Sequence, residues 1–158
     1  MKKLSSLTLF VCLILFSAPL KAQDHSMPAH ILLNKNKLVW KDAPPSLPKG
    51  AKITVLEGDM SKEGPFTVRL SLPANYKIYP HWHPAIEHVT VIEGSFYMGS
   101  GEQFAETAAT KLSAGGFAVM PIKYAHYAFT KGKAIIQLHG VGPWGITYVN
   151  EKDDPRKK

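Results

Sequence analysis

Short β-prone runs separated by turn residues make up the sequence from residue 52 onward. In the clearest run, apolar residues occupy every second position from Phe66 to Leu72, so they share one face of a strand. No segment has a convincing amphipathic helix pattern. Further strands are predicted at residues 53–57, 76–83, 87–93, 95–98, 117–120, 125–130, 134–139 and 146–149. Many short strands with regular turns predict an all-β fold, built as a closed barrel or as two antiparallel sheets.

The chain has 158 residues, which suits one domain with a proper core but not two. Scattered prolines and little periodicity mark residues 23–50 as an arm that leads into this domain. We expect four regions in chain order. They are a signal peptide (1–22), the N-terminal arm (23–50), one β domain (51–150) and a charged C-terminal tail (151–158).

The start of the chain has the three parts of a secretory signal peptide. Two lysines follow Met1, an apolar run extends from Leu9 to Phe16, and small residues with one proline occupy residues 17–22. The apolar run is too short to span a membrane as a helix. We therefore expect cleavage after Ala22 and a periplasmic or secreted protein, with no membrane segment once the signal is removed.

Cys12 is the only cysteine of the chain, and it lies inside the apolar run of the signal peptide. The mature chain would therefore contain no thiol, which excludes disulfides, thiolate zinc sites and cysteine nucleophiles. Any metal ion would have to be held by histidine and carboxylate side chains.

Cleavage would also lower the formal net charge of +7, because three lysines leave with the signal peptide. Removing three of the 19 basic residues and none of the 12 acidic ones leaves a net charge of +4. Much of this charge lies in residues 156–158, and no basic helix or aromatic-basic stripe typical of nucleic-acid binding is present. We expect a small-molecule ligand or substrate and no nucleic-acid partner.

Residues 79–88 read Y-P-H-W-H-P-A-I-E-H and concentrate three histidines and one glutamate. His81 and His83 stand at alternate positions, so on a strand they point to the same side. Glu87 follows four residues later, and the prolines beside the histidine pair restrict the backbone and reduce the entropy cost of aligning ligands. Imidazole and carboxylate suit a divalent Mn, Fe, Co, Ni, Cu or Zn ion. A fourth ligand is needed from elsewhere, and His126 is the best candidate.

These residues resemble the two sequence motifs of the cupin family. The first motif runs glycine, five residues, His-x-His, three or four residues, glutamate, six residues, glycine. The second runs glycine, five residues, proline, one residue, glycine, two residues, histidine, three residues, asparagine. The matching residues in this chain are His81, His83, Glu87 and Gly94 for the first motif, and Gly115, Pro121 and His126 for the second.

The resemblance covers residues 50–149 and implies a single-domain, all-β cupin (RmlC-like) jelly-roll barrel. It further implies that His81, His83, Glu87 and His126 hold a divalent transition metal. The chain is most similar in kind to small secreted single-domain cupins. Such cupins commonly dimerise through strand edges, so we expect a homodimer in which the arm at residues 23–50 covers an edge.

Three positions depart from the motifs. Asn75 replaces the first glycine, and asparagine tolerates the left-handed backbone conformation better than most residues. Lys123 replaces the glycine after Pro121, where lysine would be strained, so we expect this turn to take another conformation. Thr130 replaces the final asparagine, which is a mild change.

Other candidate residues have weaker support. His88 follows Glu87 directly and should point to the opposite face of the strand. Gln137 and His139 share a face and would be pocket groups if that face lines the barrel, which the sequence leaves open. The sequence Gln23-Asp24-His25 would form a square-planar copper or nickel chelate if cleavage frees the amine of Gln23.

Residues 140–145 match the spacing G-x-G-x-x-G, but a proline and β-branched residues follow where a dinucleotide site needs a helix. We interpret these glycines as a bend or bulge that packs Trp144 against the barrel.

The resemblance leads to two main hypotheses of function. The first is a metal-dependent enzyme, such as a dioxygenase, isomerase or decarboxylase acting on a small oxygenated molecule, in which Glu87 is also the catalytic base. Three histidines and one carboxylate leave coordination positions free for water, dioxygen or a chelating substrate. The second is a metal- or ligand-binding cupin without turnover, and a purely structural jelly roll is a third, weaker alternative. Fold alone does not select among these chemistries.

Overall fold

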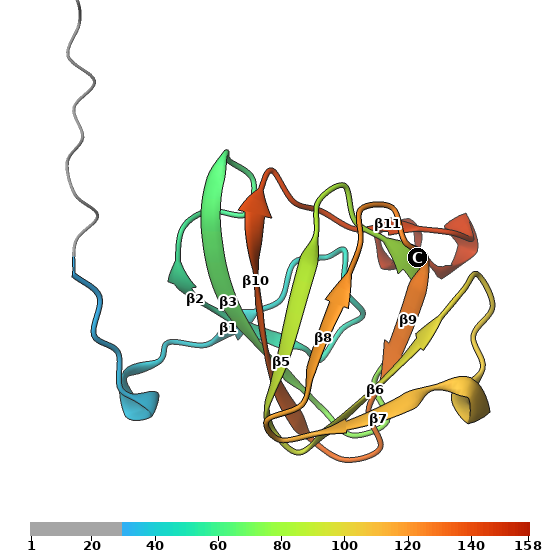
Figure 1. Cartoon of the computed structure of the whole chain (residues 1–158), viewed down its shortest axis with the longest axis horizontal. Helices are drawn as coiled ribbons and strands as arrows, with labels where there is room; N and C mark the ends of the chain where they lie inside the picture. The colour runs from blue at the N-terminus through green and yellow to red at the C-terminus, as the bar shows by residue number, and fades with distance from the viewer. Residues whose placement is uncertain (1–29) are drawn as a thin grey trace, which may run out of the picture. The chain divides into compact units, whose positions relative to one another are not determined.

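Two antiparallel β-sheets pack against each other in the computed structural model, which describes residues 30–158 (Figure 1). The first sheet contains, in spatial order, β1 (Lys41–Asp42), β2 (Lys52–Glu57), β3 (Gly64–Leu72), β10 (Ala134–Gly142), β5 (Glu87–Glu93) and β8 (Phe117–Met120). The second contains β11 (Thr147–Tyr148), β4 (Lys77–Trp82), β9 (His126–Phe129), β6 (Ser95–Ser100) and β7 (Thr110–Ser113). Ile31–Lys158 form one compact unit, so the predicted all-β, single-domain architecture is confirmed.

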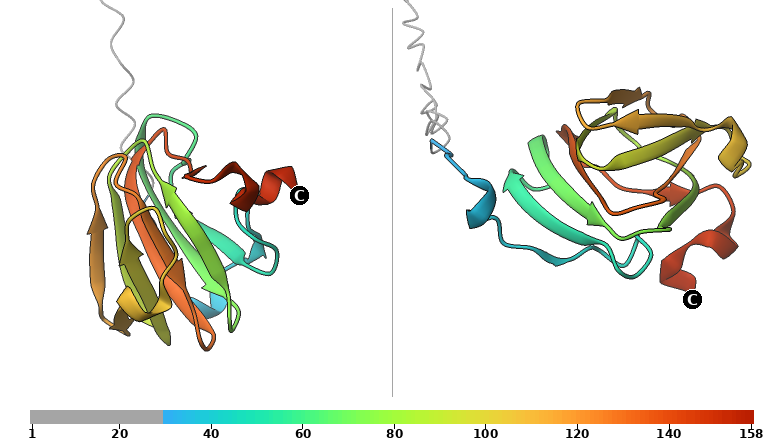
Figure 2. Two further views of the ribbon diagram at one scale, coloured as in Figure 1. Left: turned by 90° about the vertical axis from the view of Figure 1, so that its right-hand side faces the viewer. Right: turned by 90° about the horizontal axis from the view of Figure 1, so that it is seen from below.

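The two sheets lie face to face (Figure 2). Side chains from their facing surfaces form one hydrophobic core. The four alternating apolar residues of β3 all point into it, and none is more than 3 % exposed. Burial of each such side chain stabilises the fold by about 1.5–3 kcal/mol. The second sheet contributes Ile78 from β4, together with Phe96 and Met98 from β6. The alternation seen in the sequence therefore defines the inner face of the first sheet.

The helical elements of the described residues are four 3-10 turns of three residues each. They are η1 (Lys35–Lys37), η2 (Glu106–Ala108), η3 (Glu151–Asp153) and η4 (Pro155–Lys157). No helix within residues 30–158 is long and apolar enough to cross a membrane. The predicted signal peptide, its cleavage after Ala22 and the Gln23-Asp24-His25 sequence lie outside the described residues.

The predicted strands agree with the observed ones, with two omissions. β5 and β8 have the bounds that the sequence predicts, and β10 continues three residues beyond its prediction, to Gly142. The sequence reading missed β1 and β7. β7 reads Thr-Lys-Leu-Ser and has one half-buried apolar residue, Leu112, so it carries no alternating pattern. β1 has only two residues, both exposed, and is held by its pairing with β2.

Both non-glycine replacements in the motif turns adopt the left-handed conformation, with φ of 57° at Asn75 and at Lys123. The expectation of a different turn at Lys123 was therefore wrong. The backbone N–H of Lys123 donates to the carbonyl of His83 at 2.9 Å, and this bond keeps the turn in its glycine-like form. Strain at such a residue costs roughly 1–2 kcal/mol, which the surrounding structure has to offset.

Thr130 ties β9 to the turn that precedes β4. Its hydroxyl donates to the carbonyl of Pro73 at 2.6 Å and accepts from the backbone N–H of Tyr76 at 3.0 Å. Thr130 is 2 % exposed, so these bonds satisfy polar groups that water cannot reach.

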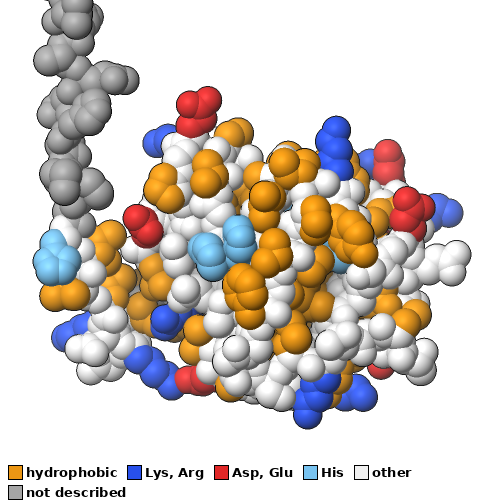
Figure 3. Space-filling view, in the orientation of Figure 1, with side chains coloured by type: hydrophobic (Ala, Val, Ile, Leu, Met, Phe, Trp, Pro, Cys, Tyr) orange, Lys and Arg blue, Asp and Glu red, His pale blue; other side chains and the backbone are white. Residues whose placement is uncertain are grey.

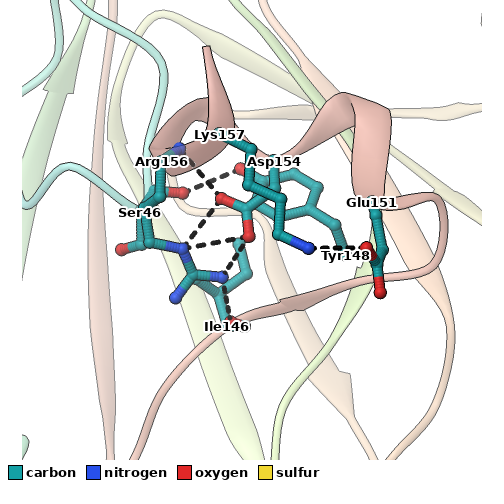
Figure 4. A network of polar contacts seen from close by, with 7 residues as sticks. All are labelled: Ser46, Ile146, Tyr148, Glu151, Asp154, Arg156 and Lys157. Carbon is teal, nitrogen blue, oxygen red and sulfur yellow. Dashed lines mark hydrogen bonds and ion pairs between the residues drawn. The ribbon is translucent and has the colours of Figure 1, made fainter.

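The C-terminal residues fold back onto the domain through a polar network (Figure 4). The guanidinium of Arg156 donates to both carboxylate oxygens of Asp154 at 2.7–3.1 Å and holds the pKa of Asp154 below its usual value. Arg156 also donates to the carbonyl of Ile146 at 3.3 Å, and the hydroxyl of Tyr148 donates to the carbonyl of Ser46 at 2.9 Å. These bonds fix the loops at Ser46 and Ile146, which line the cavity described below.

Candidate metal centre

The four predicted ligands lie together between the two sheets. His81 is near the end of β4, His83 directly follows that strand, Glu87 begins β5 and His126 begins β9. All four are buried, with exposed fractions between 1 % and 6 %. The ligand nitrogens of the three histidines lie within 4.8 Å of one another.

Strand pairing explains why residues that are far apart in the sequence meet here. His81 is the direct partner of His126 across β4 and β9, and the imidazole centroids lie 4.3 Å apart. The register between these strands shifts between Ile78 and His81, so an irregularity precedes the first ligand. Bulges of this kind redirect side chains and occur frequently beside functional sites.

Each of the three imidazoles is oriented by a backbone carbonyl. The Nδ1 atoms of His81, His83 and His126 lie 2.7, 2.7 and 2.9 Å from the carbonyl oxygens of Tyr79, Gly145 and Tyr124 respectively. A carbonyl only accepts, so each Nδ1 must carry the proton and donate it. The neutral ring then has a free lone pair on Nε2, which is the tautomer that a metal ligand requires.

Glu87 lies beside two of these Nε2 atoms. Its Oε2 lies 3.2 Å from Nε2 of His126 and 3.5 Å from Nε2 of His83. Nε2 of His83 is fully buried and has no hydrogen-bond partner. An unpaired buried nitrogen costs about 1–3 kcal/mol unless another group satisfies it. Three free lone pairs beside a carboxylate fit a divalent transition metal, whose charge and empty orbitals would satisfy all four groups.

The site favours neutral histidines. Burial, followed by the neighbouring rings of His126 and His83, holds the pKa of His81 well below its usual value of 6.5. Burial also lowers the pKa of His83, although the Glu87 carboxylate partly opposes this effect. Because a metal competes with protons for Nε2, lowered pKa values leave the lone pairs available at neutral pH.

Trp144 packs directly on the site. Its ring stacks on His83 with centroids 4.1 Å apart and planes 19° apart, and it also contacts Phe66 at 5.7 Å. The backbone N–H of Trp144 donates to the carbonyl of Met60 at 2.7 Å. The prediction that residues 140–145 form a bend with Trp144 packed against the barrel is confirmed, and the same bend supplies the carbonyl that orients His83.

A cavity of about 450 Å³ opens beside the four ligands. Its walls come from the inner faces of both sheets, and its rim includes Ser46, Val55 and the loop from Gly58 to Ser61. Val55 is 54 % exposed and also lines the cavity, so the cavity reaches the surface near the end of β2.

Gln137 and His139 do not line this cavity. Along β10 the inner positions are Ala134, Ile136 and Leu138, so Gln137 and His139 lie on the outer face of the sheet. There the side-chain carbonyl of Gln137 accepts from Nε of Arg69 at 3.0 Å.

His88 and His139 stack with their rings 4.7 Å apart and nearly parallel, at 7°. Figure 3 shows a histidine patch among hydrophobic side chains over the first sheet. The prediction that His88 points away from Glu87 is confirmed, because β5 alternates between buried and half-buried residues with Glu87 on the buried side.

Sequence reasoning missed the groups that orient the ligands. Three of them are backbone carbonyls, at Tyr79, Tyr124 and Gly145, and a carbonyl has no residue-type signature. The stacking of Trp144 on His83 was also missed, and its only signal was the conspicuous glycine-proline bend that presents the ring.

No family model matches the sequence, and no curated protein matches it at a significant level. Solved structures do resemble it. The polyketide cyclase RemF from Streptomyces resistomycificus superposes with a TM-score of 0.65 at 15 % identity, over 80 % of this chain and 89 % of that one. A protein from Methylibium petroleiphilum, provisionally named an acetylacetone dioxygenase, superposes with a TM-score of 0.62 at 16 % identity, over 87 % of this chain and 90 % of that one.

An RmlC-like cupin from Shewanella frigidimarina gives a TM-score of 0.54 at 16 % identity, over 69 % of this chain and 87 % of that one. At such low identity these likenesses establish the fold and no more. Together with the two antiparallel sheets, they show that this chain has the cupin (RmlC-like) fold.

Proposed function

We propose that this chain is a periplasmic or secreted metal-binding cupin in which His81, His83, His126 and Glu87 hold one divalent transition metal. The three Nδ1–H donors bound to backbone carbonyls carry the proposal, because they leave the Nε2 lone pairs of three clustered histidines free, two of them beside the Glu87 carboxylate. A buried histidine in an ordinary core would also need an acceptor for its N–H, but three such rings whose ligand nitrogens lie within 4.8 Å of one another, beside a buried carboxylate, fit a metal site. Mn, Fe, Co, Ni, Cu and Zn all accept such ligands.

We propose further that the metal serves catalysis on a small oxygenated molecule. The metal would supply Lewis acidity and an open position for a chelating oxygen. Glu87 is close to two ligand nitrogens and would act as the base that holds a substrate proton at Oε2 once substrate weakens its contact with the metal. The resemblance to a polyketide cyclase and to a protein provisionally named a dioxygenase supports this class of substrate by analogy of fold only.

A specific observation favours the alternative of a binding module without turnover. Gln137 and His139, the polar groups that could have bound a substrate or exchanged a proton with it, lie outside the cavity. Glu87 and Asp59 are the carboxylates among the described residues that line it.

Metal analysis of three proteins tests the site. The wild-type chain, His126→Ala and the control His139→Ala would be expressed through their own signal sequence, and their metal content measured by mass spectrometry. We expect near-stoichiometric metal in the wild type and in His139→Ala, whose imidazole lies on the outer face, and a large loss in His126→Ala. Equal metal content in the wild type and His126→Ala would refute the site.

Turnover separates the enzyme from the binding module. Acetylacetone is a suitable probe because it is a small chelating diketone whose consumption is visible by ultraviolet absorption. Consumption by the metal-loaded wild type, but not by His126→Ala, would support the enzyme. The same assay would be repeated with other small oxygenated chelators. Stoichiometric binding of these molecules without consumption of any of them would support the binding module.

A further inference from the structure

The cavity beside the metal ligands is walled almost entirely by apolar side chains. The two sheets contribute opposing inner faces, from β3 and β10 on one side and from β4 and β6 on the other. The side chains concerned are Val68, Leu70, Ile136 and Leu138 on the first sheet, and Ile78, Phe96 and Met98 on the second. A volume of about 450 Å³ lies within the range of pockets that enclose small organic ligands.

Few polar groups line the cavity away from the four ligands. One is Nε1 of Trp144, a buried donor without a partner, and the acidic and serine groups are already engaged or lie at the rim. The carboxylate of Asp59 accepts from the backbone N–H of Ser61 at 2.9 Å and from its hydroxyl at 2.7 Å. Asp59 also pairs with Lys62, and the carbonyl of Ser46 accepts from Tyr148. A ligand with many hydroxyl groups would therefore leave several of them unpaired inside the cavity, at a substantial cost for each.

Charge narrows the ligand further. No lysine or arginine is among the described residues that line the cavity. A divalent ion with one carboxylate and three neutral imidazoles would have a net charge of +1, which balances one negative charge. A dicarboxylate or a phosphorylated molecule would bring a second negative charge into apolar surroundings with no cation to pair it.

We propose that the site takes a molecule with one monoanionic oxygen-chelating head and an apolar body. The head, such as an enolate or hydroxamate, would bind at the four ligands. The body would lie between the walls of the two sheets. The choice of head rests on the proposed metal function, whereas the preference for an apolar body rests on the cavity alone.

A series of hydroxamic acids tests the proposal, because every member has the same head. Acetohydroxamic and hexanohydroxamic acids would be titrated into zinc-loaded protein by calorimetry, with oxalate as a dianionic chelator that lacks a tail. Burial of each additional methylene raises the affinity about fourfold, so the hexanoyl compound should bind roughly 200-fold more tightly than the acetyl one. Equal affinities for the two hydroxamates, or tightest binding of oxalate, would overturn the proposal.

Two neighbouring residues of β10 provide a matched pair of variants. Ile136 points into the cavity and is 2 % exposed, whereas Ile135 lies on the outer face. Ile136→Gln should remove most of the gain from the longer tail and leave acetohydroxamate binding nearly unchanged. Ile135→Gln makes the same chemical change and should leave both affinities as in the wild type. If Ile136→Gln does not fold, the chain-length series on the wild type still decides the question.

The metal-free protein distinguishes failure of this inference from failure of the proposed function. The neutral fluorophore N-phenyl-1-naphthylamine should bind to it and be displaced by hexanol. Such binding in a protein that takes up no metal would refute the proposed function and support the apolar site. Metal uptake without a chain-length effect would refute the apolar site and leave the metal function standing.

Discussion

Acidification should destabilise the metal-free protein, because two histidines of the candidate centre resist protonation in the folded state. In the folded chain His81 and His83 have pKa values below the usual 6.5, mainly because they are buried. In the unfolded chain both take up a proton as the pH falls through about 6.5. Between the two pKa values the unfolded state binds more protons, so the stability is present above pH 6.5 and is lost as the pH falls below it.

The number of protons sets the magnitude. Each histidine that stays neutral only in the folded state lowers the free energy of unfolding by at most about 1.4 kcal/mol per pH unit. Between about pH 7 and pH 5.5, His81 should therefore contribute a loss of about 1.3 kcal/mol, and His83 up to as much again. A total stability of about 5–15 kcal/mol makes this loss readily measurable.

Urea denaturation of chelator-treated protein across this pH range measures the effect. His81→Gln removes one titrating group, so the number of protons taken up on unfolding, given by the slope of the unfolding free energy against pH, should fall by about one. The control is His30→Gln, because His30 is exposed. The pKa of His139 is also lowered, so His139 adds to the pH dependence of the wild type. The difference between the wild type and His81→Gln removes this contribution and leaves that of the buried site. An unfolding free energy that is the same at about pH 7 and pH 5.5, or a wild-type slope in His81→Gln, would refute this reasoning.

Substitutions at three further positions test residues that stabilise the fold or the site. Thr130→Val should lower the free energy of unfolding by about 1–3 kcal/mol, because the buried N–H of Tyr76 loses its acceptor. Thr130→Ser keeps both hydrogen bonds and should lose only about 1 kcal/mol for its buried methyl group, measured by urea denaturation. Lys123→Gly should raise the stability by about 0.5–1 kcal/mol, because glycine adopts the observed φ of 57° without strain; a thermal midpoint below that of the wild type would contradict this. Trp144→Ala should weaken zinc affinity about tenfold, measured by competition with a chelating dye, because His83 loses the ring stacked on it, while Trp144→Phe should retain most of the affinity.

The sequence predicts the strands well wherever one face of a strand is buried and the other is not. β3 has this property from Phe66 to Leu72, and its alternation alone identifies the inner face. β7 lacks it, because this strand lies at the edge of the second sheet and buries little. β7 is held by its pairing with β6, and backbone pairing leaves no pattern of residue types in the sequence.

The same distinction applies to the site. The four ligand side chains could be predicted, because their types and spacing resemble known motifs. The face of Gln137 and His139 could not, because it depends on the register of β10 between β3 and β5. A shift of one residue would turn both side chains into the cavity, so only the pairing of the folded chain decides the matter.

The position of the centre between the sheets explains why these residues fit a functional role better than a structural one. Glu87 belongs to the first sheet, whereas His81 and His126 belong to the second. Without a metal, this arrangement buries one carboxylate and an unpaired imidazole nitrogen, which apolar side chains of similar size would avoid. The surrounding chain nevertheless orients every imidazole by a backbone carbonyl. These side chains lower the stability of the metal-free fold, yet they are held in the orientation that a metal ligand needs. Such an arrangement is expected where a bound ion joins the two sheets and restores the lost stability.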